Sequence, residues 1–220
     1  MNRKLFILPL AALLMTACSS DEGQSTVDME KNLVKIRLSS GLNMQTRAYT
    51  PTQASAIADN QIVYAWINNA DDSEKYKAWE LKVVSGGNLD NNVTTEAAKY
   101  YPSTATGAIT VYAIHGNNLG ITNGADSYPT AAITHTVSVA QNVGTNYEAS
   151  DLLYAKESLT RSSSRQLLTF KHMLSKIEVG LKAGAGAPDL TGATIEILNT
   201  LPQASVTLAK ATAADFAISA

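Results

Sequence analysis

The chain of 220 residues predicts an all-β fold, a β-sandwich built from short strands. Many short segments alternate apolar and polar residues with a period of two, as in a strand with one buried face. Clusters of Gly, Asn and Ser separate these segments as turns, and no amphipathic helix of three turns follows the N-terminal leader. Nine tyrosines against three phenylalanines also fit a β protein. Such a chain can form one large domain or two small ones.

Residues 1–17 have the pattern of a signal peptide, with Arg3 and Lys4 before an apolar run that is too short to span a bilayer. The sequence MTAC that ends at Cys18 resembles a bacterial lipobox, in which the cysteine is acylated and the chain is cut before it. We therefore expect Cys18 to carry a lipid anchor with palmitate-type chains. A secretory leader with an incidental cysteine is the alternative. Because Cys18 is the only cysteine, internal disulfides and a cysteine-based metal cage are excluded.

Residues 18–31 form a polar tether that begins with the acidic pair Asp21 and Glu22. Such a tract behind a lipidated cysteine resembles the export tag that sends lipoproteins to the outer face of the outer membrane. A solvated linker is the alternative interpretation.

The first predicted strand is LVKIRL, residues 33–38. Its apolar side chains alternate with Lys35 and Arg37, which places one set on a buried face and the charged set in solvent. The buried set is Val34, Ile36 and Leu38. A polar loop follows this strand.

Five further segments have strand patterns: residues 61–67, 76–84, 99–102, 109–114 and 130–139. The first of them is apolar on both faces, which predicts a central strand. The second ends in the turn sequence SGGN. The third and fourth are expected to pair through Gly107. In the fifth, His135 belongs to the inward-facing set.

Residues 151–184 are the centre of the predicted fold. Leu168 and Phe170 occupy even positions, whereas the apolar residues downstream occupy odd positions. Because such a change of parity needs an extra residue, it predicts a β-bulge or a strand that passes from one sheet to the other near residues 172–175. The expected buried set is Phe170, Ile177, Val179 and Leu181.

The expected domain boundary follows the hinge AGAGAP at residues 183–188. Residues 32–184 would form an N-terminal β-sandwich domain. Residues 185–220 would form a linker and the beginning of a second, truncated β domain, with strands at 193–198 and 205–208.

One combination of motifs resembles a known family, the fimbrillins, which are subunits of lipoprotein-derived pili of certain Gram-negative bacteria. It consists of DLLYA at 151–155, a polar RSSSR turn, and TFKHMLSK at 169–176. Two weaker matches are residues 97–117 and the sequence TRA at 46–48. The residues that carry the resemblance are Asp151, Leu152, Leu153, Tyr154, Ala155, Thr169, Phe170, Lys171, His172, Leu174, Ser175 and Lys176.

The resemblance implies a transthyretin-like β-sandwich and a structural or adhesive role in a fimbrium, at the outer membrane and cell surface. In this family an arginine-specific protease removes the N-terminal segment, and a strand from a neighbouring subunit fills the vacated groove. In this chain Arg47 and Ala48 match the processing site, within a polar loop accessible to a protease. Other pilus subunits, as strand donors or acceptors, are the expected partners. The alternative is that residues 33–38 are a permanent edge strand.

Chemical motifs give no support for catalysis. The histidines His115, His135 and His172 lack metal-site spacing, so His135 is expected to be a hydrogen-bonded core residue and His172 to fix local packing. There is no nucleophile elbow, and nothing in the sequence suggests the facing pair of carboxylates that a glycosidase needs. The formal net charge of −2 does not suit a nucleic-acid partner. We therefore expect no enzyme activity, no cofactor and no metal.

A second hypothesis is a monomeric surface lipoprotein that captures a glycan or a host protein through a tyrosine-rich face. Tyrosine is also a common sandwich residue, which is the simpler explanation. The tyrosines expected to be exposed are Tyr76, Tyr100, Tyr101, Tyr128 and Tyr147.

Overall fold

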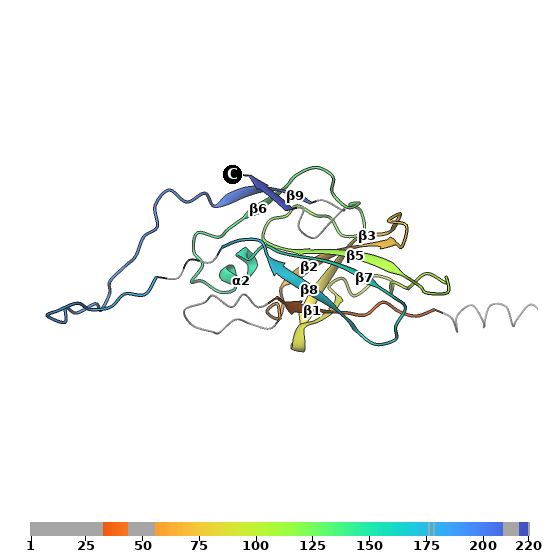
Figure 1. Ribbon diagram of the computed structural model, residues 1–220, viewed down its shortest axis with the longest axis horizontal. Coiled ribbons are helices and arrows are strands. Elements are labelled where there is room, and N and C mark those ends of the chain that lie inside the picture. Colours follow the sequence, from red (N-terminus) through yellow and green to blue (C-terminus); the bar gives the residue numbers. More distant parts are fainter. Residues whose placement is uncertain (1–32, 44–55, 176, 178, 209–215, 220) are drawn as a thin grey trace, which may run out of the picture. The chain divides into compact units, whose positions relative to one another are not determined.

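The computed structural model describes residues 33–43, 56–175, 177, 179–208 and 216–219 (Figure 1). By its internal contacts the chain divides into two compact units, Met1–Leu33 and Val34–Ala220. The second unit contains all the described strands.

Seven strands close into a barrel in the order β1-β4-β3-β2-β5-β7-β8. Their bounds are β1 Leu38–Leu42, β2 Ile62–Asn69, β3 Glu74–Val84, β4 Asn88–Asn91, β5 Ile109–His115, β7 Leu153–Leu159 and β8 Gln166–His172. Neighbouring strands are antiparallel, except that β1 and β8 pair in parallel. The first strand therefore closes the barrel between β4 and β8.

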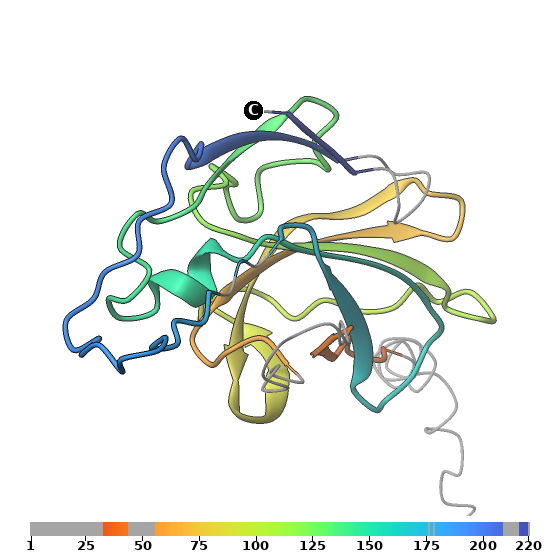
Figure 2. The same ribbon diagram turned by 60° about the vertical axis from the view of Figure 1, so that its left-hand side comes forward.

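Three further strands form a second sheet in the order β10-β9-β6 (Figure 2). They are β6 Ile133–Thr136, β9 Gln203–Leu208 and β10 Phe216–Ser219. The other described elements are the short helix α2 (Asn146–Ser150) and the 3-10 turn η1 (Ser85–Gly87).

The barrel interior is filled by the side chains that alternate inward along its strands. Because successive strand residues point to opposite faces, each strand contributes every second residue. Burial of each large apolar side chain stabilises the fold by about 1.5 to 3 kcal/mol. The interior members are Ile36, Leu38, Val63, Ala65, Ile67, Trp79, Leu81, Val83, Leu89, Ile109, Val111, Ala113, Leu153, Ala155, Leu159, Leu168 and Phe170, with Ile57 and Tyr101 from the connections.

A second core lies between the outside of the barrel and the three-stranded sheet. Trp66, on the outer face of β2, packs edge-on against Tyr128 at 5.4 Å between ring centroids. Val206 and Leu208 of β9 belong to the same cluster. Because β2 is buried on both faces, the prediction of a central strand at residues 61–67 is confirmed.

The all-β prediction is confirmed. The expected transthyretin-like sandwich is not confirmed, because the seven strands close into a barrel and only the second sheet lies against it. Closure follows from β1, which hydrogen-bonds to β4 on one side and to β8 on the other.

The prediction for the segment after β8 is wrong. β8 ends at His172, and the described residues of 173–184 contain no strand. Phe170 is buried as expected, but the three expected core residues downstream are 65%, 52% and 54% exposed: Ile177, Val179 and Leu181. Apolar alternation shows that a segment can form a strand; it does not show that a partner strand is present.

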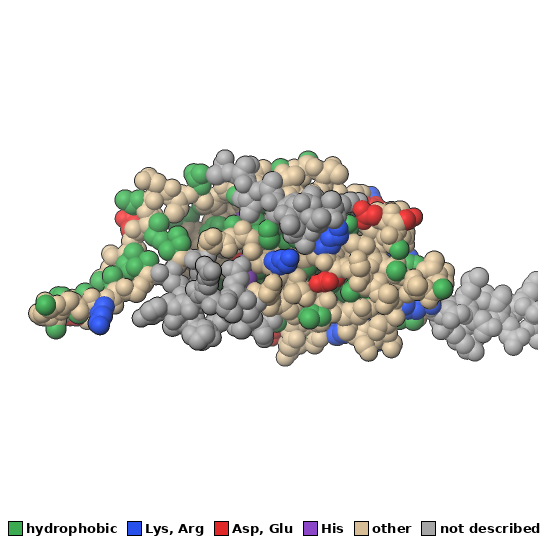
Figure 3. All heavy atoms as spheres, viewed as in Figure 1, with side chains coloured by type: hydrophobic (Ala, Val, Ile, Leu, Met, Phe, Trp, Pro, Cys, Tyr) green, Lys and Arg blue, Asp and Glu red, His purple; other side chains and the backbone are tan. Residues whose placement is uncertain are grey.

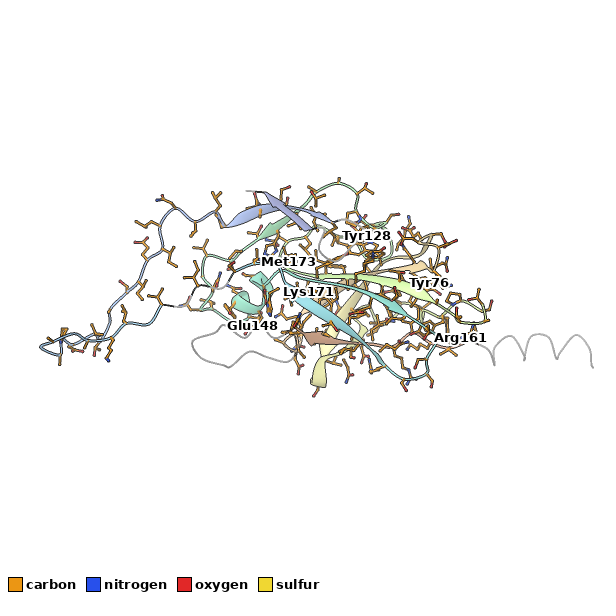
Figure 4. All side chains as sticks on the ribbon, viewed as in Figure 1. Tyr76, Tyr128, Glu148, Arg161, Lys171 and Met173 are labelled. Carbon is orange, nitrogen blue, oxygen red and sulfur yellow. The ribbon has the colours of Figure 1, made fainter. Side chains whose placement is uncertain are left out.

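The change of parity marks the point where the chain leaves the barrel interior. Phe170 lies inside the barrel. Met173, which is labelled in Figure 4, packs with Leu174 against the second core. There is neither a strand nor a bulge in residues 173–175. The pairing of β2 with β3 contains the register shifts instead, between Ala65 and Asn68.

Of the two strands expected after residue 185, one is present. β9 covers the prediction for 205–208, whereas residues 193–198 form no strand. β9 pairs with β6 and adds side chains to the second core. The domain boundary after Gly184 stays a prediction.

Within the described part of the chain, no helix is long and apolar enough to cross a membrane.

Candidate functional site

The candidate site is the N-terminal strand segment, residues 34–42, together with the groove in the barrel that it fills. β1 pairs with β8 at five positions, from Leu38 opposite Gln166 to Leu42 opposite Phe170. It pairs with β4 at only two positions. Upstream of β1, residues 34–36 bond instead to residues 99–101, with Ile36 N 2.9 Å from Lys99 O. Residues 99–101 therefore pair with the N-terminal segment, and the predicted pairing of 99–102 with 109–114 is wrong.

The predicted orientation of this segment is confirmed. Ile36 and Leu38 are 1% and 0% exposed, and Val34 is half-buried against the same interior core. Lys35 and Arg37 are exposed. The alternation continues into β1 as Ser40, which is buried and donates a hydrogen bond from Oγ to the carbonyl oxygen of Gly87 at 3.1 Å.

Arg165 joins the N-terminal strand to β4 from outside the barrel. Its Nη1 donates to the carbonyl oxygens of Leu38 at 3.0 Å and Leu89 at 3.2 Å. Its Nη2 lies 2.7 Å from Oδ1 of Asp90. Because both side chains of this ion pair are partly exposed, the pair itself adds little stability. The two carbonyl bonds make Arg165 a bridge across the short β1–β4 pairing.

Gln166 holds the other side of the segment. Its backbone N–H donates to Arg37 O at 2.9 Å, and its Nε2 donates to the hydroxyl of Tyr101 at 2.6 Å. At the far end of β1, Asn43 N donates to Phe170 O at 2.8 Å. Backbone bonds to β8 therefore hold residues 37–43, whereas residues 34–36 are held by residues 99–101.

Gly87 lets β1 approach the turn after β3. Its φ is +74°, a left-handed conformation that favours glycine, and an added Cβ would lie 2.8 Å from the carbonyl oxygen of Ser40. A side chain at this position would push β1 away from its groove. The predicted SGGN turn is thus confirmed as η1, and it is also part of the site.

A cavity of about 240 Å³ lies beside the N-terminal segment, between residues 35–37 and β4. Its lining side chains and backbone belong to Lys35, Ile36, Arg37, Trp79, Leu89, Asp90, Asn91 and Arg165. At residues 35–37, beside this cavity, the segment does not pair with β4, because the pairing with β4 is confined to Leu38 and Ser39.

The predicted site residues Cys18, Arg47 and Ala48 lie outside the described residues. Asn43, at the end of the N-terminal segment, is four residues from Arg47 in sequence. The lipid anchor and the processing site stay predictions.

The three histidines meet at one corner of the fold, although sequence spacing gave no sign of it. His115 lies 2.9 Å through Nε2 from the carbonyl oxygen of Glu148, and 2.7 Å through Nδ1 from that of Ile62. His135 Nε2 lies 3.0 Å from Ser150 O. His172 Nδ1 lies 2.8 Å from Oδ2 of Asp151. All three therefore hold α2 and the residue after it.

The environments of two of these histidines differ. The hydrogen bond to the Asp151 carboxylate raises the pKa of His172, against the opposing effect of burial. Burial lowers the pKa of His135, which has a single hydrogen-bonded ring nitrogen. His135 is the buried, hydrogen-bonded residue that we expected. The described residues contain no group of His, Cys, Asp and Glu arranged to hold a metal ion.

The tyrosine-rich face does not form as expected. Tyr101 and Tyr128 are buried, and Tyr128 OH lies 3.2 Å from Tyr154 OH. Tyr76 and Tyr100 are half-buried and contact each other. Only Tyr147 of the expected set is well exposed. Tyr101 lies in the barrel interior, and Tyr128 belongs to the second core that covers the outer face of the barrel.

The geometry is that of an all-β structural module whose first strand closes the sheet. The profile of the Fimbrillin-like family matches residues 46–219, most of the chain, so this chain belongs to the fimbrillin-like family. That family comprises pilus-type and adhesion-type surface proteins and is generally non-enzymatic. The N-terminal strand segment lies outside the matched range.

Among solved structures, the chain is similar to a crystal structure from Bacteroides ovatus, described as that of a candidate cell adhesion protein. The identity is 15% and the TM-score is 0.49. The alignment covers 64% of this chain and 52% of the other, so the chain matches about half of that protein. None of the curated proteins compared with the chain matches it.

Sequence reasoning missed several residues of the site. Arg165 was assigned only to a polar turn, and Ser40 and Gly41 to a loop. The repeated small residues after LVKIRL were the available signal, because small side chains also fit where two backbones approach closely.

Proposed function

We propose that the chain is a structural or adhesive subunit of a cell-surface pilus, exported as a lipoprotein precursor and assembled by strand exchange. Cys18 carries the lipid anchor at the outer membrane, and cleavage after Arg47 separates residues 34–42 from the rest of the chain. The neighbouring subunit then supplies a strand to the vacated groove. Family membership supports the assembly role.

The observation that carries this proposal is the bonding of the N-terminal segment. Ile36 and Leu38 are fully buried. The segment nevertheless comes first in the sequence among the barrel strands, and it pairs with β4 at only two positions. Its removal would expose an apolar groove between two strand edges with unpaired backbone groups. Such edges recruit a complementary strand.

The direction of the groove sets a requirement for the incoming strand. It must run parallel to β8 and antiparallel to β4, since that is how β1 runs. It must also place apolar residues at alternate positions, because only one face of the groove opens into the barrel interior.

Limited digestion with an arginine-specific protease tests the proposal. We expect a cut after Arg47, identified by mass spectrometry, followed by increased binding of a hydrophobic dye and by oligomer formation on sizing. The control is an Arg47→Gln variant, which should stay monomeric under the same treatment. Cleavage that leaves the chain monomeric, with no newly exposed apolar surface, would favour a monomeric module that captures a glycan or host protein.

A further inference from the structure

One exposed segment repeats the side-chain pattern of the N-terminal strand. Residues 34–41 read VKIRLSSG and residues 177–184 read IEVGLKAG. In both, three large apolar residues alternate, a small residue takes the next inward position, and a glycine follows. The two segments differ in their outward positions, which face solvent in the N-terminal strand.

The two copies of the pattern are in opposite environments. The N-terminal copy is buried in the barrel, whereas Ile177, Val179 and Leu181 are all more than half exposed. Hydrophobic side chains stand along this part of the chain in Figure 3. No described strand pairs with residues 179–184. The segment has the pattern of a strand without a partner.

The apolar side chains of the exposed copy fit the groove positions that face the barrel interior. Leu181 would replace Leu38 with the same side chain, and Val179 would replace Ile36 with one methylene fewer. Ile177 would take the position of Val34, which is only half-buried. The apolar contacts of the groove would therefore be kept.

The small residues also correspond. Ala183 would replace the buried Ser40, and it would lose the hydrogen bond to Gly87 O. Gly184 would replace Gly41, where an added Cβ would lie 2.9 Å from Cδ1 of Leu167. A glycine at this position lets the Leu167 side chain keep its place across the strand.

The segment cannot enter the groove of its own chain. In the register of β1, Leu181 would lie opposite Gln166, and Ile177 four residues further back. The chain would have to return about 33 Å along β8 after His172, at about 3.3 Å per residue. The link from His172 to Ile177 reaches at most about 18 Å. Parallel neighbours also need a crossover of about a dozen residues.

We infer that residues 177–184 are a donor strand for the groove of a second copy of this chain. This inference rests on the proposed function, since the groove opens only when residues 34–42 leave it. The contact joins two different surfaces of the same molecule, so it is head-to-tail and continues from copy to copy. It supplies a route to a homopolymer that uses only residues within this sequence.

Peptide binding to the cleaved chain tests the inference. A specific protease site is inserted after Arg47 in the full chain, the chain is cut, and a fluorescent peptide of residues 33–43 reports occupancy of the groove. We expect an unlabelled peptide of residues 177–187 to displace it, about fivefold more weakly than unlabelled 33–43 because one hydrogen bond is lost. The same peptide with Val179→Asp and Leu181→Asp should bind about a hundredfold more weakly or worse.

The outcomes separate the two claims. Binding of 33–43 without displacement by 177–187 would overturn the donor-strand inference and leave the proposed function standing. If 33–43 itself fails to bind, the groove does not open, and both claims are wrong.

Variants of the full chain give an independent test. Val179→Asp with Leu181→Asp should leave the uncut chain folded, because both side chains are exposed, and should prevent oligomers after cutting. The matched control is Ile195→Asp with Ile197→Asp, a pair that is 48% exposed at each position but is not followed by a small residue and glycine. The control should assemble. Equal assembly of both variants would overturn the inference.

Discussion

The guanidinium of Arg165 donates a hydrogen bond to the carbonyl oxygen of Leu38 at 3.0 Å, across 127 residues of sequence. The same nitrogen reaches Leu89 O on β4. A side chain from the turn before β8 thus connects the first strand to its weaker neighbour. The bond joins the segment that we propose leaves the barrel to a strand that stays in it.

Removing this bridge should weaken the hold on the N-terminal segment. We expect Arg165→Gln to lower the free energy of unfolding by about 1 kcal/mol, since charged hydrogen bonds are lost from a partly exposed position. Hydrogen exchange should also rise in residues 36–42 before the rest of the barrel. Lys77→Gln, at an exposed position, is the control. Equal exchange in the two variants would contradict the bridging role of Arg165.

Gly87 should tolerate no side chain. Gly87→Ala combines a left-handed φ of +74° with a clash against Ser40 O, and we expect it to cost about 1 to 3 kcal/mol. Gly124→Ala is the matched control, because Gly124 has a φ of +70° and nothing within 4 Å of an added Cβ. Urea denaturation measures both. If the two substitutions cost the same, backbone strain alone explains the effect and the close approach of β1 does not matter.

Substitutions on the two sides of His172 should differ strongly in their effect on stability, because Phe170 is buried and Ile177 is exposed. Phe170→Ala should destabilise the fold by about 3 to 5 kcal/mol, because it removes a fully buried ring. Ile177→Ala should change the stability by no more than about 0.5 kcal/mol, because the side chain is 65% exposed. A large loss from Ile177→Ala in the monomer would show that this residue is buried and would restore the original prediction.

The pair of His172 and Asp151 should give stability that depends on pH. The hydrogen bond to Asp151 raises the pKa of His172 above its ordinary value of 6.5. Stability from this pair is therefore full below that value and is lost as the pH rises through the folded-state pKa. We expect Asp151→Asn to destabilise the chain clearly at about pH 5.5 and much less at about pH 8.5.

His135 acts in the opposite direction, because burial lowers its pKa and stability is lost as the pH falls below 6.5 toward the folded-state value. His135 is present in both proteins, but the Asp151 carboxylate also raises its pKa, so Asp151→Asn lowers that pKa further and adds to the penalty below pH 6.5 in the same direction. An Asp151→Asn penalty that is the same at both pH values would contradict the charged pair.

The lipid anchor gives a prediction for the N-terminal cysteine. Cys18→Ala should leave a protein without acyl chains that no longer partitions with membranes in the native host. Fractionation with detection of the acyl chains by mass spectrometry measures this directly. Unchanged membrane retention of the variant would contradict the assignment.

Local patterns predicted the parts of the fold that depend on burial of one strand face. The alternation in residues 34–38 and the two apolar faces of 61–67 were confirmed because these strands lie beside neighbours that cover them. The segment at 177–181 has an equally clear pattern, but none of the described strands pairs with its described residues. Pairing partners depend on contacts far apart in sequence, which a period of two does not encode.

The candidate site shows the same limit. Ile36 and Leu38 could be identified as buried from their spacing, but their place between β4 and β8 could not. Tyr101 is covered in the barrel interior and Tyr128 in the second core, although both were predicted to be exposed. The meeting of the three histidines at α2 comes from β5, β6 and β8, and no spacing along the chain connects them.

The central claim is that residues 34–42 can leave a barrel that remains folded. Hydrogen exchange before and after cleavage at a protease site inserted after Arg47, with removal of the N-terminal fragment, tests it most directly. The account predicts faster exchange in residues 166–170 and 88–91, which flank the groove, and unchanged protection in β2, β5 and β7. Addition of a peptide of residues 33–43 should restore the slow exchange. Loss of protection throughout the barrel, or no change in the two flanking strands, would contradict the account.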